Sequence, residues 1–285
     1  MPFTLSHPAA VIPLARGRLV PSALVAGSMA PDVPSFLGLA EGLRAATHEP
    51  VGVLTVDLVL GIVLLTLFQV VWKRPLVALA PGWARRRLTG PATGFRRSMI
   101  VWVPPSVLVG GVTHVFWDAF THRYHGFADV MPALVTTSFA GMEAYRWLQY
   151  GSGVIGIAVI AWWLYRWARR EPVHPAPLPG LSGRAVLGVV GAVAAAAIAG
   201  GLLAAVLLFN QPDLPRTFHM TVASGVIGTI SAGILSLTLY GVAFVLLERR
   251  GTATSGPDEP VPDEAVPDEQ APDGPVTRLE GPPAR

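Results

Sequence analysis

The stretch of residues 220–247, MTVASGVIGTISAGILSLTLYGVAFVLL, contains no charged residue. An α-helix rises about 1.5 Å per residue, so about 20 mostly apolar residues cross the hydrocarbon core of a bilayer, which is roughly 30 Å thick. A helix over this stretch is therefore long enough to span a membrane. Four further stretches have a similar length and composition: residues 51–72, 98–120, 148–167 and 185–209. We predict an all-α polytopic membrane bundle with about five transmembrane helices.

The composition agrees with a membrane protein. Of 285 residues, 52% are hydrophobic and only 14% are charged, and the mean hydropathy is +0.50. Soluble domains carry about 25% charged residues. The chain has no cysteine, which excludes disulfides, thiol catalysis and thiolate metal sites and leaves His and carboxylate as metal ligands. We expect a multi-pass membrane protein.

The basic residues predict the orientation of the bundle, because Lys and Arg collect in cytoplasmic loops. Seven of them lie between residues 73 and 97, and further arginines lie at residues 166–184 and 249–250, whereas the other two loops hold few. We therefore expect the N-terminal fifty residues outside and the C-terminus inside. The arginines lie between apolar runs rather than on one polar stripe, which favours membrane lipids as partners and argues against nucleic acid.

Three regions are expected along the chain. Residues 1–170 hold three spans, together with a shorter apolar run at 19–31 that cannot span and is interpreted as a re-entrant or interfacial helix. Residues 171–250 add two spans. Residues 251–285 repeat Pro-Asp every five positions and contain 8 of the 18 acidic residues. Such a segment has little to bury and repels itself, so we predict a disordered acidic tail.

Three acidic or histidine residues fall inside the predicted spans: Asp57, His114 and Asp118. Each costs at least a few kcal/mol in hydrocarbon unless it is paired or ligated. The expected topology places them near the outer membrane boundary, on the same side as the loop residues His7, Asp32, His48, His122 and His125. These histidines and carboxylates can therefore converge on one site.

His114, Asp118 and His122 are spaced at i, i+4 and i+8. In a helix each step of four residues drifts by only about 40°, so the three side chains are expected on one face. A metal ion can take two ligands one turn apart, and the third residue could reach a second ion or a substrate phosphate. The spacing predicts a His/Asp metal site that includes this helix.

Each of these residues also has a purely structural interpretation. His114 and Asp118 could form a buried hydrogen-bonded pair, and Asp32 could cap the following turn. Asp57 could bond to a neighbouring helix without approaching a metal. His122 could belong to a wet interfacial loop. The loop residues His125 and Glu143 are more often solvated than ligating.

The motifs at residues 1–10 (MPFTLSHPAA), 26–32 (AGSMAPD), 47–48 (TH) and 114–118 (HVFWD) resemble those of a bacterial membrane-protein family of unknown function. The resemblance covers roughly residues 1–170, and it implies a multi-pass protein of a bacterial cytoplasmic (inner) membrane. The same order of ligands is similar to that of membrane-bound metal-dependent hydrolases and, more remotely, of the zinc-dependent phospholipase C and nuclease superfamily.

That resemblance implies a zinc site. By carry-over, Asp32, His48, His114 and Asp118 hold one ion, and Asp118 bridges to a second ion near His7. The phospholipases add a further His and a His-x-x-x-Glu pair for their remaining zinc, and no such pair follows His122 and His125 here. The resemblance therefore implies one or two zinc ions rather than three.

Three functions are compatible with these features. The first is a metal-dependent hydrolase of phosphoester or lipid-linked substrates at the outer membrane surface, with Asp32 or Asp57 as the catalytic carboxylate and His7, Asp32, His48, His114, Asp118 and His122 as metal ligands. The second is a non-catalytic membrane scaffold in which the same cluster is structural. The third is a transporter or ion pathway, which the clustering of the polar groups at one face disfavours.

Overall fold

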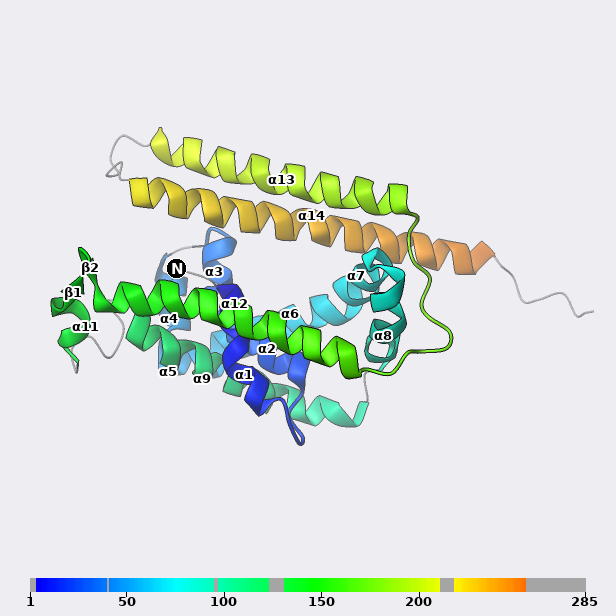
Figure 1. The fold of residues 1–285 in the computed structure, drawn as a ribbon, viewed down its shortest axis with the longest axis horizontal. Helices are drawn as coiled ribbons and strands as arrows, with labels where there is room; N and C mark the ends of the chain where they lie inside the picture. The colour runs from blue at the N-terminus through cyan, green and yellow to red at the C-terminus, as the bar shows by residue number, and fades with distance from the viewer. Residues whose placement is uncertain (1–3, 40, 95–96, 123–130, 211–217, 255–285) are drawn as a thin grey trace, which may run out of the picture. The chain divides into compact units, whose positions relative to one another are not determined.

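The computed structural model describes residues 4–39, 41–94, 97–122, 131–210 and 218–254. The contacts place the described residues up to Leu247 in one compact unit, and a second unit begins at Glu248. Five helical runs among the described residues are long and apolar enough to cross a membrane, which confirms the predicted multi-pass helical protein (Figure 1). Their bounds are Pro50–Leu79, Arg97–Thr121, Ala144–Arg170, Gly183–Phe209 and Met220–Arg250.

The first run is longer than its predicted range of 51–72. It consists of α5 (Pro50–Gly52), a π-helical turn η4 (Val53–Asp57), α6 (Leu58–Leu67), a second π-helical turn η5 (Phe68–Trp72) and α7 (Lys73–Leu79). Charge at the membrane boundary does not end a helix, so the run continues past Lys73. It stops at Ala80, whose backbone is extended (φ −69°, ψ 145°) because the next residue, Pro81, disfavours the helical conformation there.

The second and third runs lie next to the first 36 residues. The second run combines η6 (Arg97–Trp102) and α9 (Val103–Thr121), and the third is α12 (Ala144–Arg170). Helix α9 contacts α2, α6 and α12. Between the spans lie α8 (Gly82–Thr93), α11 (Ala133–Thr136) and a two-stranded antiparallel hairpin of β1 (Ser138–Phe139) and β2 (Met142–Glu143). This hairpin is the one departure from the predicted all-α fold among the described residues.

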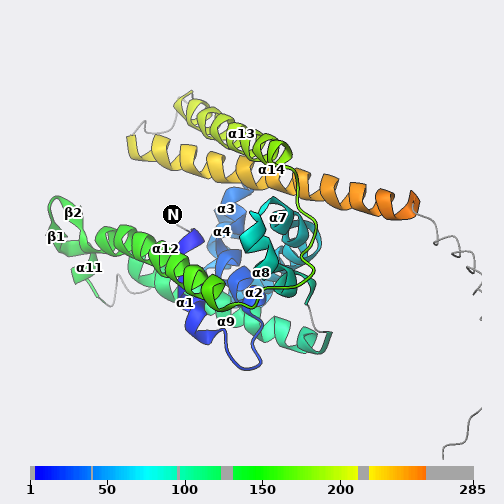
Figure 2. The ribbon, with the colours of Figure 1, turned by 45° about the vertical axis from the view of Figure 1, so that its right-hand side comes forward.

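Helices α13 (Gly183–Phe209) and α14 (Phe218–Thr254) run side by side (Figures 1 and 2). Ser182 caps α13 by accepting a hydrogen bond from the Ala185 amide. Hydrogen bonds join α14 to elements of the first 79 residues, from Ser231 Oγ to Phe36 O (2.6 Å), from Trp72 Nε1 to Thr238 Oγ1 (3.1 Å) and from Tyr240 Oη to Pro75 O (3.0 Å). Helix α14 continues into the first residues of the predicted tail, and residues 255–285 lie outside the described part.

The short apolar run at 19–31 forms α2 (Pro21–Met29), which rises only about 14 Å. It packs against α9 and α6, with Ala23, Leu24 and Ser28 fully buried. Two glycines allow this close approach. A Cβ on Gly27 would lie 2.1 Å from Val107 O, and a Cβ on Gly110 would lie 2.3 Å from Leu24 O. Helix α2 therefore sits inside the bundle and holds the next turn of the chain against α9.

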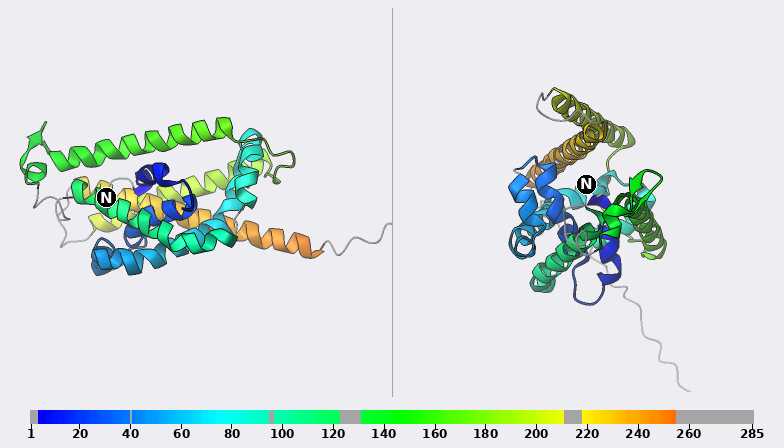
Figure 3. Two further views of the ribbon diagram at one scale, coloured as in Figure 1. Left: turned by 90° about the horizontal axis from the view of Figure 1, so that it is seen from below. Right: turned by 90° about the vertical axis from the view of Figure 1, so that its left-hand side faces the viewer.

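Short helical segments complete the first 47 residues (Figure 3). They are η1 (Thr4–Ser6), α1 (Pro8–Val11) and η2 (Ile12–Leu14) before α2, and η3 (Ala30–Asp32), α3 (Val33–Phe36) and α4 (Glu41–Thr47) after it. The N-terminal turn η1 contacts α12, and η3 contacts α4, α6 and α9. These contacts bring the sequence motifs of the N-terminal region onto the membrane helices.

Candidate metal centre

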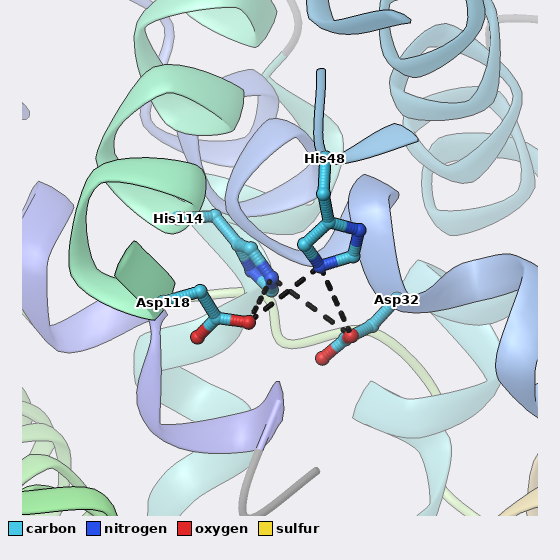
Figure 4. Close-up of side chains that lie close together, drawn as sticks. All are labelled: Asp32, His48, His114 and Asp118. Atoms are coloured by element: carbon cyan, nitrogen blue, oxygen red, sulfur yellow. Dashed lines mark ion pairs between the residues drawn. The ribbon is translucent and has the colours of Figure 1, made fainter. Parts of the chain in front are cut away.

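Four side chains from three separate segments meet at the junction of η3, α4 and α9 (Figure 4). Asp32 ends η3, His48 follows α4, and His114 and Asp118 lie one turn apart on α9. One ligand atom from each lies within 4.8 Å of all the others. Asp32, His114 and Asp118 are buried, and His48 is half-buried.

The distances are close to those that a small ion requires. His114 Nε2 and His48 Nε2 each lie 3.5 Å from Asp118 Oδ2, and they lie 3.8 Å and 4.0 Å from Asp32 Oδ1. A tetrahedral ion with bonds of about 2.0–2.1 Å needs ligand atoms roughly 3.4 Å apart. Small side-chain movements would therefore bring all four atoms into coordination distance.

Hydrogen bonds to backbone carbonyls orient both imidazoles. His114 Nδ1 lies 2.8 Å from Ser28 O, and His48 Nδ1 lies 3.0 Å from Arg44 O. A carbonyl oxygen only accepts, so each Nδ1 carries the hydrogen and, in the neutral ring, each Nε2 presents a lone pair to the cluster. His114 Nε2 is buried and has no hydrogen-bond partner among the described residues. The donor set, two imidazole nitrogens and two carboxylate oxygens, thus fits a divalent cation such as Zn²⁺.

Supporting contacts that the sequence did not identify hold the ligands in place. Thr4 Oγ1 donates a hydrogen bond to Asp32 Oδ2, so Oδ1 is the oxygen that faces the histidines. Thr47 is fully buried and donates to Pro31 O at 2.9 Å, which ties the segment before His48 to the turn that carries Asp32. Thr4 and Thr47 lie inside the motifs MPFTLSHPAA and TH. Their place in these motifs is the one feature of the sequence that could have identified them as supporting residues.

His7 lies on the other side of Asp118. Its Nε2 is 3.4 Å from Asp118 Oδ1, and its ring stacks on that of His114 with centroids 3.9 Å apart. Burial lowers the pKa of His7 to about 4, so its imidazole is neutral at pH 7. A neutral imidazole beside a carboxylate is a usable metal ligand.

His122 departs from the expected geometry. Helix α9 ends at Thr121, and His122 has an extended backbone (φ −128°, ψ 140°), so it no longer follows the helical face that carries His114 and Asp118. Its Nδ1 still lies 3.5 Å from Asp118 Oδ2, but its Nε2 lies 3.2 Å from the Gln149 amide nitrogen. Burial lowers the pKa of His122. The residue therefore lies at the edge of the cluster, between α9 and α12.

Asp57 is buried at the end of the π-helical turn η4, with 1% of its surface exposed. Neither carboxyl oxygen has a hydrogen-bond partner among the described residues, so the bond to a neighbouring helix that the structural interpretation requires is not observed there. Its Cβ lies 4.0 Å from the position that a Cβ on Gly111 would take, and Gly111 precedes His114 by one turn of α9. Asp57 thus lies beside the cluster but outside the group of four.

Other candidates lie elsewhere. His125 falls outside the described residues. Glu143 forms an ion pair with Arg146 at 3.0 Å, with both side chains about one-third exposed, as a solvated loop acid would.

One known family covers most of this sequence. A domain of unknown function (DUF4184) matches residues 1–242. The chain belongs to this family. The match confirms the resemblance to a family of unknown function and extends it from residue 170 to residue 242, so that it includes α13 and most of α14. No curated protein and no solved structure matches the chain. The DUF4184 match gives no evidence of hydrolase activity, so a function must be inferred from the chemistry of the site.

Proposed function

We propose that this DUF4184 protein is a membrane-bound, metal-dependent hydrolase that acts on phosphoester or lipid-linked substrates at the extracytoplasmic membrane face. The supporting observation is the meeting of Asp32 Oδ1, His48 Nε2, His114 Nε2 and Asp118 Oδ2 within 4.8 Å. With neutral imidazoles, four acceptor atoms face one another, and this arrangement is repulsive unless a cation or a proton lies between them.

Zinc is the ion that this donor set favours, because imidazole and carboxylate are both common zinc ligands. When bound, it would lower the pKa of water to about 7 and polarise a phosphoryl oxygen. Asp118 presents Oδ2 to the group of four and Oδ1 to His7. A second ion on the His7 side is therefore part of the proposal, as one or two zinc ions per chain.

The carboxylates take different roles in this proposal. Both oxygens of Asp32 are engaged, one with Thr4 and one facing the histidines, so Asp32 serves as a ligand. Asp57 is the carboxyl group left to accept a proton from an attacking water, because both of its oxygens lack partners among the described residues. The low-dielectric surroundings of a buried carboxyl group strengthen its interaction with that proton.

A non-catalytic scaffold is the alternative, and one observation favours it. A tetrahedral ion that took all four ligands would have no open position, which is typical of structural zinc sites. The cluster also joins η3, the end of α4 and α9, and the His114–Ser28 hydrogen bond attaches α9 to α2. A structural ion at this point would stabilise the bundle without turnover.

Hydrolysis separates the two functions. Detergent-purified protein loaded with zinc is assayed on a chromogenic phosphodiester and on phospholipids, together with Asp118→Ala. His174→Ala is the matched control, since His174 lies between α12 and α13 and bonds to Ala176 O. Zinc-dependent hydrolysis that Asp118→Ala abolishes and His174→Ala retains supports the hydrolase. Stoichiometric zinc without hydrolysis of any of these substrates supports the scaffold.

A further inference from the structure

A groove of about 610 Å³ opens between the end of α3 and the α13–α14 pair, which lie near one another in Figures 1 and 2. Its walls include Phe36 and Leu37 after α3, Ala204 and Leu208 of α13, and Ala223 and Ile227 of α14. Ligand pockets are typically about 300–1,000 Å³. The groove is therefore large enough for a substantial part of a small amphiphile.

The walls are suited to hydrocarbon. None of the described residues that line the groove is charged. Two of the three serine hydroxyls along it are already satisfied by carbonyls, Ser224 by Ala204 O at 3.1 Å and Ser231 by Phe36 O at 2.6 Å. Since α13 and α14 are membrane spans, the groove is reached from the lipid phase and takes a lipid chain more readily than a polar solute.

The groove begins beside the metal centre. Ser35 lines it and has a buried hydroxyl without a hydrogen-bond partner among the described residues. Ser35 follows Asp32 by three residues across the helical turn from η3 into α3, and side chains three apart on a helix are neighbours. The Asp32 ligand and the mouth of the groove therefore share one turn.

The order of the spans also places the groove on the same side of the membrane as the metal centre. Successive spans cross the membrane in opposite directions, so the start of the first run, the end of α9, the end of α13 and the start of α14 lie on one side. Asp57 and His114–Asp118 lie at the first two of these ends, and Leu208 and Ala223 lie at the other two. The cluster and the groove are therefore at a similar depth in the membrane.

We infer that the groove receives one hydrocarbon chain of a membrane lipid whose phosphate head group lies at the Asp32–His48–His114–Asp118 cluster. This inference rests on the proposed function and names its substrate class: phosphorylated lipids, held by their chain between α3 and the α13–α14 pair. The Ser35 hydroxyl lies between the two parts and can bond to the ester or phosphate oxygens of the lipid. Soluble phosphoesters lack the chain and are expected to be poorer substrates.

Photo-crosslinking tests the inference without requiring turnover. The full-length protein is placed in phosphatidylcholine nanodiscs with a lipid that carries a photoactivatable group in its acyl chain and a non-cleavable phosphonate head group. A diacylglycerol with the same labelled chain is the head-group control. Labelled residues are mapped by mass spectrometry with zinc and after chelation. We expect zinc-dependent labelling of residues 36–38 and 220–231 by the phosphonate lipid, and less by diacylglycerol.

Matched variants test whether the hydrocarbon chain of the lipid lies in the groove. Ala223→Phe fills the groove and should reduce labelling about tenfold, which corresponds to a loss of about 1.4 kcal/mol of binding free energy. Val222→Phe is the control, because Val222 is the adjacent residue, is 47% exposed and does not line the groove. If Ala223→Phe fails to fold, Ala204→Phe with Leu203→Phe as its control makes the same comparison from α13.

Two results overturn the inference. One is equal labelling in Ala223→Phe and Val222→Phe, which means that the chain is not in the groove. The other is equal labelling by both lipids with and without zinc, which means that the groove binds chains independently of the metal centre. Failure of the proposed hydrolase is a separate result, since the phosphonate lipid would still label the groove in a protein that does not hydrolyse phosphoesters.

Discussion

His114 Nε2 lies 3.5 Å from Asp118 Oδ2, one turn further along α9, while the other nitrogen of the same ring is held by Ser28 O at 2.8 Å. The carbonyl fixes the hydrogen on Nδ1, so a neutral His114 turns a lone pair toward a carboxylate. A protonated His114 would present an N–H to Asp118 instead and form a structural pair. Metal content therefore decides between a ligand pair and a structural pair.

Asp57→Asn tests the role of the buried carboxyl group. If Asp57 accepts a proton from the attacking water, hydrolysis should fall by about 10²–10⁴-fold, because an amide is not a base. Zinc content should stay equal to that of the wild type, since Asp57 lies outside the group of four ligands. Asp32→Asn is the comparison, and it should lose zinc as well as activity. Loss of zinc in Asp57→Asn would show that Asp57 is a ligand and contradict the assigned role.

Thr4→Val removes the hydroxyl that bonds to Asp32 Oδ2 and leaves that buried oxygen unsatisfied. We expect the variant to bind zinc with about 10–100-fold lower affinity, the usual effect of losing a supporting hydrogen bond to a metal ligand. Titration with a competing chelator measures this affinity. Thr55→Val, which removes an exposed hydroxyl bonded to Val51 O, should leave it unchanged. Equal affinities in all three proteins would mean that Thr4 does not orient Asp32.

Gly110→Ala places a Cβ 2.3 Å from Leu24 O, so α2 and α9 must move apart. We expect a loss of about 1–3 kcal/mol of stability and a lower thermal midpoint in detergent. Because Ser28 on α2 holds His114 on α9, zinc affinity should fall as well. Gly188→Ala on α13 is the control, since nothing in the described part of the chain lies within 4 Å of its added methyl group. If Gly110→Ala has the same thermal midpoint as the wild type, the close packing of α2 against α9 is contradicted.

Zinc removal should destabilise the protein. A ligand at about 1,000 times its Kd stabilises the folded state by about 4 kcal/mol, so chelation should lower the thermal midpoint of the wild type. Asp118→Asn retains the volume of the side chain. It replaces the carboxylate that lies 3.5 Å from both His48 Nε2 and His114 Nε2 with a neutral amide, which is a weaker metal ligand. Its midpoint should respond much less to chelation. A wild-type midpoint that zinc and chelator leave unchanged would argue against binding to the folded protein.

The membrane architecture could be predicted from the sequence because it depends on local composition. Each of the five spans is a continuous apolar stretch, and its length alone decides whether it crosses a bilayer. The predicted helix ends were less accurate. Helices such as α12 continue into the polar boundary up to Arg169 and Arg170, where a charged side chain is hydrated and does not disfavour the helix. The direction of insertion remains a prediction from the distribution of Lys and Arg.

The convergence of the polar residues was also predictable, because ionisable groups in hydrocarbon need partners. The details that orient them were not, since they depend on contacts between distant positions. The Ser28 carbonyl that holds His114 is 86 residues away, and Thr4 is 28 residues from Asp32. The groove beside α3 could not be anticipated either. It arises from the packing of α13 and α14 against the end of α3 and the residues after it, which carry no charged side chain that would indicate a binding site in the sequence.

Elemental analysis of the detergent-purified protein is the most direct test of the central claim, that Asp32, His48, His114 and Asp118 hold a metal ion. Wild type, His114→Ala and Asp118→Ala are compared at equal folded yield, with His174→Ala as the control. We predict one or two equivalents of zinc per chain in the wild type and in His174→Ala, and loss of zinc in the other two variants. No metal in the wild type, even after reconstitution with zinc, would contradict the account and leave His114 and Asp118 as a buried structural pair.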